Sequence, residues 1–202
     1  NPNSLGYIPG DDILKKYGNT MEASIILPKK FAKNSRFYFE TPFVSSSIFG
    51  LHNSNNGTWN TPDNASLQVF AVKENNQSFD CKFMLSSSHF QQVLTSSIFR
   101  EAYDNQKWNI SVSIRNEKRN SYETTGSLTG SYTLEFYGVN SIQDLEQNSF
   151  LVTASIDKTT AEAFFAADKM LYAGAHRQNF SGSEIHSSDV RLRNVKFWNS
   201  YV

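Results

Sequence analysis

The chain has 202 residues, and its 19 basic and 19 acidic side chains give a formal net charge of zero. Residues 1–101 carry nine basic and eight acidic groups and residues 102–202 carry ten and eleven, so neither half is polarised. Binding to a phosphate backbone normally needs a basic excess or stripe, so this balance argues against nucleic acid as a partner. The longest unbroken apolar run, 163–167, is far shorter than the roughly 18 residues needed to span a bilayer, so we expect no membrane insertion.

The composition favours an all-β fold. The 16 Phe, nine Tyr and three Trp supply enough large apolar surface for one substantial core. The 27 Ser, 20 Asn, 12 Thr and ten Gly make the chain rich in turn formers and poor in helix formers, so helix should be the minority element.

Short segments of alternating apolar and polar residues recur along the chain, as is typical of half-buried strands. They fall at 21–27, 36–40, 67–71, 79–85, 108–115, 132–137, 151–156, 170–173 and 189–198. Turn formers separate them at 53–64, 74–78, 116–130 and 179–183. Many short strands punctuated in this way predict a two-sheet antiparallel jelly-roll sandwich. We interpret residues 1–20 as an N-terminal extension or linker and 21–202 as a single sandwich domain.

One short helix is predicted at 159–167. Thr159 and Glu162 have the spacing of a capping box, in which each side chain bonds a backbone N–H at the start of the helix. Phe164 and Phe165 would anchor the helix to the core, so that it covers one end of the sandwich.

The last strand changes register within itself. Val190 and Leu192 alternate on one face, whereas Val195 and Phe197 have the opposite parity. One extra residue near Asn194 would restore a common core face, so we predict a β-bulge there. Because the chain starts with Asn rather than Met and ends just after this strand, we expect a module cut from a longer protein.

The C-terminal third carries a resemblance to a known family. Residues 170–177 (MLYAGAHR), 179–182 (NFSG) and 189–198 (DVRLRNVKFW) resemble the end of laminin G-like and concanavalin A-like lectin domains. Residues 21–28, 42–52 and 103–109 are similar to segments of such domains within large structural proteins of tailed phages and other viruses. The resemblance implies a concanavalin A-like jelly roll. It also implies, as the favoured function, a non-catalytic module of a viral structural protein that serves particle assembly or surface decoration. Its partners would be other structural chains, in a virion or extracellular setting.

The sequence predicts no enzyme. Retaining glycosidases need two carboxyl groups about 5–5.5 Å apart, which glycosidases of the resembled fold supply from one strand. Here the matching strand begins with Glu135, but Tyr137 stands where the pattern has Asp, and Val139 or Asn140 where it has the second Glu. We therefore interpret Glu135 as a residue on the solvent face of a strand.

No cofactor is expected either. The four histidines, at 52, 89, 176 and 186, have no metal-ligand spacing, and the single Cys81 fits a buried apolar position. Calcium, which some members of the resembled family bind through loop carboxylates, is a less favoured alternative. The eligible residues are Asp63, Asp80, Asp104 and Asp189.

The alternative function is a lectin-like carbohydrate-binding domain that attaches to a host or surface glycan. Sugar binding needs an aromatic face together with amide and carboxylate groups. The segment 53–64 offers both, and the candidate binding residues are Asn56, Trp59, Asn60 and Asp63. A second candidate, the turn at 175–179, is more simply explained as a structural hairpin.

Overall fold

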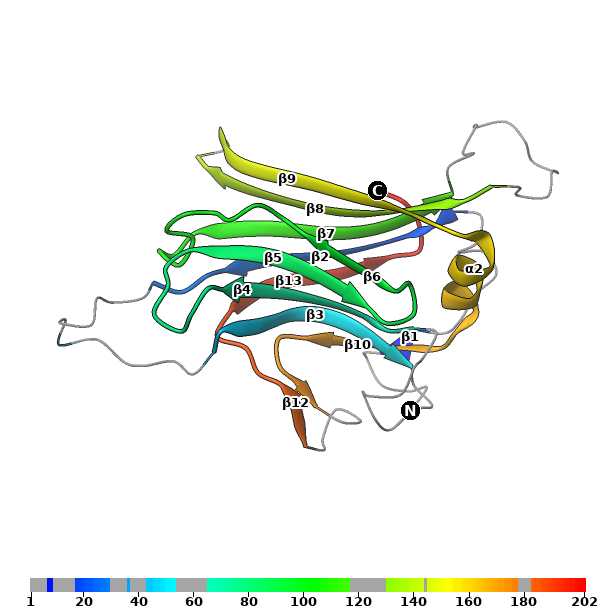
Figure 1. The fold of residues 1–202 in the computed structure, drawn as a ribbon, viewed down its shortest axis with the longest axis horizontal. Coiled ribbons are helices and arrows are strands. Elements are labelled where there is room, and N and C mark those ends of the chain that lie inside the picture. The colour runs from blue at the N-terminus through cyan, green and yellow to red at the C-terminus, as the bar shows by residue number, and fades with distance from the viewer. Residues whose placement is uncertain are drawn as a thin grey trace.

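The computed structural model describes residues 7–8, 17–29, 36, 43–53, 65–116, 130–143, 145–177 and 183–202. These residues form two antiparallel β-sheets packed face to face, with one helix at an end of the sandwich (Figure 1). The predicted all-β jelly-roll sandwich is confirmed. No helix within the described ranges is long and apolar enough to cross a membrane.

The six-stranded sheet has the order β1 (Tyr7–Ile8), β10 (Lys169–Ala173), β3 (Ser45–Asn53), β4 (Leu67–Lys73), β5 (Cys81–Ser87) and β6 (Gln92–Thr95). The five-stranded sheet has the order β13 (Arg191–Trp198), β2 (Asn19–Ile26), β7 (Lys107–Asn116), β8 (Tyr132–Ile142) and β9 (Leu145–Ile156). A separate hairpin joins β11 (His176–Arg177) to β12 (Glu184–His186). Neighbouring strands are therefore often distant in sequence.

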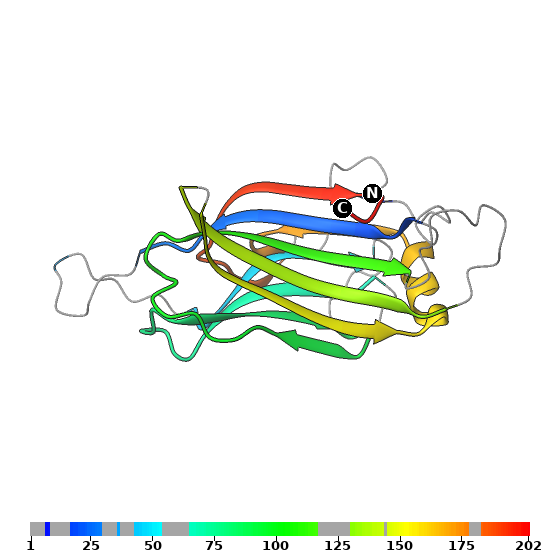
Figure 2. The same ribbon diagram turned by 90° about the horizontal axis from the view of Figure 1, so that it is seen from above.

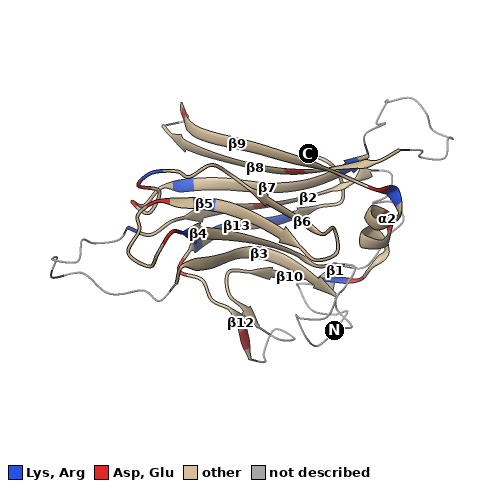
Figure 3. Cartoon of the chain, viewed as in Figure 1, with Lys and Arg blue, Asp and Glu red and all other residues tan. Residues whose placement is uncertain are grey.

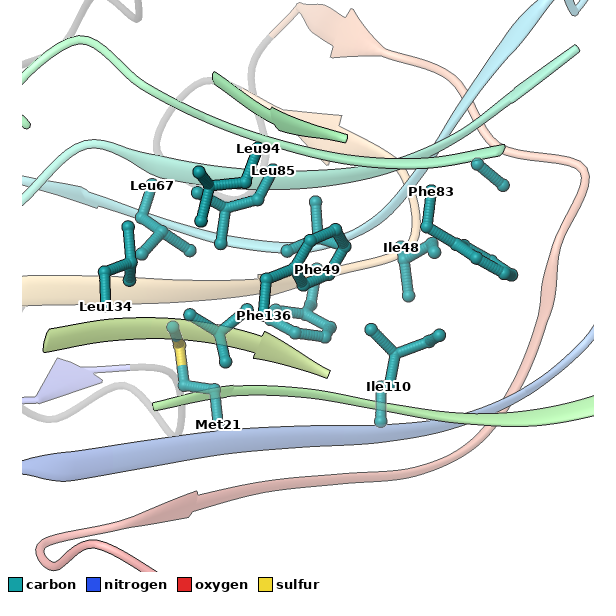
Figure 4. Close-up of a cluster of buried hydrophobic side chains, with 14 of the residues drawn as sticks. Met21, Ile48, Phe49, Leu67, Phe83, Leu85, Leu94, Ile110, Leu134 and Phe136 are labelled. Atoms are coloured by element: carbon teal, nitrogen blue, oxygen red, sulfur yellow. The ribbon is translucent and has the colours of Figure 1, made fainter. Parts of the chain in front are cut away.

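The core lies between the sheets because one residue in two along each strand is apolar and points inward. Figure 4 shows such side chains from both sheets, among them Met21 and Phe136 from one and Leu67 and Leu85 from the other. At its centre the Trp108 ring lies 4.9 Å from Phe83 and 4.6 Å from Phe99, measured between ring centroids. Cys81 is buried in this core, as predicted.

Gly138 makes room for one of the aromatic rings. It lies on β8 opposite Phe150 of β9, and a Cβ built on it would stand 2.3 Å from the Phe150 ring. Phe150 can therefore lean across β8 and pack edge-on against Phe136, with ring centroids 4.9 Å apart.

The predicted bulge in the last strand is confirmed. β13 pairs with β2 in one register up to Leu192 and in a shifted register from Asn194 onward. Leu192, Val195 and Phe197 consequently all pack against the core.

The predicted helix is confirmed as α2 (Lys158–Ala166), but the predicted capping box is wrong. The helix begins one residue before Thr159, and its N-cap is Asp157, whose Oδ1 accepts the Thr160 N–H at 2.9 Å. A carboxylate suits this position because it both accepts the free backbone N–H and stabilises the positive end of the helix dipole. Phe164 and Phe165 are fully buried, as expected.

Parts of the segment 1–20 join the sheets. Tyr7–Ile8 pairs with Met170 and Lys169 of β10, and Asn19 and Thr20 open β2. The strand predicted at 36–40 lies outside the described residues except for Arg36.

Candidate functional site

The outer face of the five-stranded sheet is polar, and the C-terminal segment covers one end of it. The N–H of Val202 donates to Thr20 Oγ1, and Thr20 and Ser113 are buried there. Alternation along the strands directs one set of side chains away from the core, and the pairing register aligns them in rows across the sheet. We call this surface the polar face and define it by the outward residues Thr20, Glu22, Ser111, Ser113, Arg115, Thr133, Glu135, Tyr137, Leu151, Thr153, Lys196 and Trp198. Figure 2 shows the five strands side by side, from red β13 to yellow β9, with no described helix crossing them.

A three-residue network lies on the polar face near the end of β7, where the C-terminal segment contributes Tyr201. Both the Nε and an Nη of Arg115 lie 2.8 Å from Oε1 of Glu135, and the Tyr201 hydroxyl donates to Oε2 at 2.9 Å. The hydrogen bond to Glu135 raises the pKa of Arg115, and burial followed by the same carboxylate raises the pKa of Tyr201. The charge of Glu135 is therefore matched by a guanidinium, and its oxygens are held in a fixed direction.

A second ion pair lies across the edge of the face. Lys196 of β13 approaches Glu22 of β2 at 3.9 Å, and its ammonium lies 5.6 Å from the centre of the Trp198 ring. Figure 3 shows charged positions of both signs scattered over the strands rather than one patch of a single sign. The two ion pairs thus leave little net charge on the polar face.

Two aromatic side chains are exposed on this face among hydroxyl groups. Tyr137 is 38% exposed and Trp198 is 40% exposed. Ser111, Thr133 and Thr153, which are at least partly exposed, lie between or beside them. Exposed rings stack on the apolar faces of sugars and hydroxyl groups exchange hydrogen bonds with sugar hydroxyls, so this arrangement suits a neutral carbohydrate.

A second polar cluster lies on the outer face of the six-stranded sheet, under the β11–β12 hairpin. The Tyr172 ring centre is 4.5 Å from that of His176, and His176 Nε2 is 3.1 Å from the amide nitrogen of Gln68. His186 meets the His176 ring edge-on, with centroids 5.7 Å apart. Gly50 lies between Tyr172 and Gln68 in the sheet, and a Cβ there would stand 2.3 Å from Gln68 Oε1, so glycine allows the cluster to close.

This histidine cluster is held neutral. His176 is completely buried, and burial, together with the nearby His186 and His52, lowers its pKa to about 3. Burial also lowers the pKa of His186. A neutral imidazole can accept a proton, but the His176 ring is covered by the hairpin that carries it. The cluster therefore holds β11 against the six-stranded sheet.

The sequence-predicted sugar-binding residues Asn56, Trp59, Asn60 and Asp63 lie outside the described residues, in the connection between β3 and β4. They stay a prediction. The predicted structural hairpin at 175–179 is described as far as residue 177, and within it His176 is completely buried.

Three of the four aspartates eligible for calcium lie in the described part of the chain. Asp80 and Asp104 line a cavity of about 450 Å³, where Lys29 forms an ion pair with Asp104 at 2.7 Å. Asp189 pairs with Lys73, and Asp63 lies outside the described residues. Within the described ranges no group of three or more His, Cys, Asp or Glu is arranged to hold a metal ion.

Sequence reasoning missed both surfaces. It found no metal-ligand spacing among the histidines, but His52 of β3 and His176 of β11 both pack against the Tyr172 ring of β10. In the sequence, Tyr137 stood out only because it replaces the Asp of the glycosidase pattern. The available signal was parity, because Glu135 and Tyr137 alternate with the core residues Leu134 and Phe136.

No family model and no curated protein matches this chain. Two solved structures are similar in fold. An alginate lyase from Pseudomonas aeruginosa has 7% identity and a TM-score of 0.48, with 94% of this chain and 68% of that one aligned. An endo-1,3-beta-glucanase from Streptomyces sioyaensis has 8% identity and a TM-score of 0.45, with 96% and 66% aligned.

This chain thus spans about two thirds of the length of each solved structure, and at these identities the likeness concerns the fold alone. Both structures are of enzymes, which contradicts the prediction that the chain is not an enzyme, since that prediction treated this fold without a paired-carboxylate motif as non-catalytic. The comparisons give no support to the viral structural role that the sequence resemblance implied.

Proposed function

We propose that this domain binds a carbohydrate chain along the polar face. The observation that carries the proposal is the exposure of Tyr137 and Trp198 on a surface that otherwise carries hydroxyl groups, two matched ion pairs and Leu151. A surface whose charges are already paired can bind a neutral polar ligand without removing water from an unpaired charge.

The spacing of the two rings favours an extended ligand. Trp198 lies on β13 and Tyr137 on β8, which are separated by β2 and β7. Three strand spacings amount to about 14 Å, so the rings contact different sugar units of one chain rather than a single monosaccharide. The hydroxyl group of Ser111 lies in the interval between them, whereas Ser113 is buried and accepts a hydrogen bond from Thr20.

The test is titration of the protein with soluble oligosaccharides, followed by calorimetry and by Trp fluorescence. The first panel contains a neutral β-1,3-glucan and an alginate, because the two solved structures of similar fold are named for these polymers. We expect Tyr137→Ala and Trp198→Ala each to weaken binding by roughly tenfold or more, as loss of a stacking ring does.

The matched control is Val93→Ala, which shortens an exposed side chain on β6 of the other sheet and should leave binding unchanged. Trp59→Ala separates the two candidate sites. If Trp59→Ala abolishes binding while Tyr137→Ala and Trp198→Ala do not affect it, the glycan binds at the predicted loop and not on the polar face. No binding of any glycan in a broad array would refute the proposed function.

A further inference from the structure

The β11–β12 hairpin is seated on the outer face of the six-stranded sheet by its two histidines. His176 packs on Tyr172 of β10, with ring centres 4.5 Å apart, and its Nε2 lies 3.1 Å from the amide nitrogen of Gln68 on β4. His186 meets Phe70 of the same strand edge-on, with ring centres 5.3 Å apart. Figure 1 shows β12 outside the two sheets. The contacts between hairpin and sheet therefore involve two rings that can take up a proton.

Both ends of the hairpin are anchored to β3. The N–H of Gly174, shortly before β11, donates to the carbonyl oxygen of Ile48 at 2.7 Å, and the N–H of Ser47 donates to the carbonyl oxygen of Ser187, just after β12, at 3.0 Å. Gly174 has a φ of 72°, a left-handed conformation that favours glycine. β11 and β12 thus form a flap whose attachment points can stay in place when the histidine contacts break.

The hydrogen bonds around Gln68 require an unprotonated nitrogen on His176. The amide nitrogen of Gln68 donates to the hydroxyl group of Ser47 at 2.8 Å and to the carbonyl oxygen of Phe49 at 3.4 Å. A carbonyl oxygen only accepts hydrogen bonds, so the nitrogen of the amide, and not its oxygen, must lie on this side. The same nitrogen faces Nε2 of His176, which must therefore accept as well. A proton on Nε2 would place donor against donor.

The surroundings of His176 also leave a positive charge there uncompensated. The described titratable groups that face it are His186 of β12, His52 of β3 and Tyr172 of β10, and none of them is a carboxylate. The described residues of β4 under the hairpin do not titrate, and Glu184 of β12 is exposed. Burial, with the two other histidines, holds the pKa of His176 at about 3, and burial lowers the pKa of His186. A proton on either ring therefore favours an open hairpin.

We propose that the β11–β12 hairpin is a flap that acid releases from the six-stranded sheet, uncovering the sheet face that carries Tyr172, Gln68 and Phe70. Protonation of His176 removes the acceptor that Gln68 requires and leaves a charge in the interface. Both penalties disappear when the flap moves into water. The flap lies on the six-stranded sheet, so its release is independent of carbohydrate binding on the polar face of the other sheet.

The size of the effect follows from the two states of His176. An exposed histidine takes up a proton near pH 6.5, whereas the seated His176 does so only at about pH 3. The ratio of open to seated flap therefore rises about tenfold per pH unit between these values, and about 25-fold from about pH 7 to about pH 5. Above about pH 6.5 the seated flap has its full stability.

The experiment is hydrogen exchange on the full chain at about pH 7 and about pH 5, measured by mass spectrometry and corrected for the intrinsic exchange rates. We expect the protection of peptides from β11 and β12 to fall about 25-fold at the lower pH, while peptides from β7 in the core keep their protection. The matched control is His89→Gln, which removes a histidine that contacts α2 and should leave this pH dependence unchanged.

Two variants test the mechanism. His176→Gln keeps an acceptor but no titrating group, so the fall in protection should shrink to the part that His186 contributes. Gln68→Glu places a carboxylate against the ring, which stabilises a protonated His176 in its seat, so the flap should stay protected at the lower pH. Equal protection of the wild-type hairpin at both pH values, or an equal loss in β7, would overturn the proposal. So would an unchanged pH dependence in His176→Gln or a flap that still opens in Gln68→Glu.

Discussion

The ammonium of Lys73 and the carboxylate of Asp189 lie 3.4 Å apart in the interior, although 116 positions separate them in the chain. Ser46 and Tyr103 both donate hydroxyl hydrogen bonds to Oδ1 of the same carboxylate, at 2.6 and 3.1 Å. This network ties β3 and β4 of one sheet to the segment that leads into β13 of the other.

We expect Asp189→Ala to lower the free energy of unfolding by about 3–5 kcal/mol, because it leaves a buried ammonium without its counter-charge. Urea denaturation measures the change. The double variant Lys73→Met/Asp189→Leu should lose less than Asp189→Ala alone, since no isolated charge stays behind. Lys29→Ala breaks a pair that is about half exposed and should cost at most about 1 kcal/mol. Equal losses of unfolding free energy in Asp189→Ala and Lys29→Ala would show that burial does not determine the strength of the Lys73–Asp189 pair.

His176 should make the free energy of unfolding depend on pH. Burial lowers its folded-state pKa to about 3, whereas an unfolded chain protonates a histidine near pH 6.5. The unfolded state therefore binds the additional proton between these values, so stability is complete above about pH 6.5 and falls as the pH drops toward about 3, by up to about 1.4 kcal/mol per pH unit.

The measurement is urea unfolding at a series of pH values from about 7 to about 4 for the wild type and for His176→Gln. Glutamine carries no titrating group, so the slope of stability against pH should flatten in the variant. An identical slope in both proteins would contradict the assignment to His176.

Gly138→Ala should destabilise the core by about 1–3 kcal/mol, because the new methyl group would overlap the Phe150 ring and force it to move. Thermal and urea unfolding measure the loss. Adding Phe150→Leu to Gly138→Ala removes the clash, so Phe150→Leu should cost less in the Gly138→Ala variant than in the wild type. Simple additivity of the two changes would contradict the steric explanation.

Cys81 should be unreactive in the folded protein. Burial raises its pKa to about 12, so almost no thiolate exists at neutral pH, and the thiolate is the reacting form. A colourimetric thiol reagent should detect no cysteine under native conditions and one per chain in guanidinium chloride. Val93→Cys places a thiol on an exposed site and should react at once in the native state.

The strands and the bulge were accessible to sequence reasoning because each depends on neighbours along the chain. Alternation at Met21, Ala23 and Ile25 marks a strand with one buried face, and the change of parity between Leu192 and Val195 marks the bulge. These are local consequences of a side-chain period of two.

The candidate surfaces were not accessible, because they depend on which strands become neighbours. Tyr137 and Trp198 share a face only through the order β13, β2, β7 and β8, which no local pattern specifies. The prediction of the N-cap of α2 was wrong for a different reason. Asp157 and Thr159 are both good N-caps, and the choice rests on where β9 ends.

The position of β2 has a consequence for how the chain reaches this fold. Its two partners are β7 and β13, so Ile25 lies beside Trp108 on one side and Leu192 on the other. During synthesis β2 leaves the ribosome before either partner, and β13 follows only after all the other described strands. Folding dominated by such distant pairings is slow. Until β13 arrives, one backbone edge of β2 is unpaired and can bond another nascent chain, so keeping nascent chains dilute should favour recovery of folded protein.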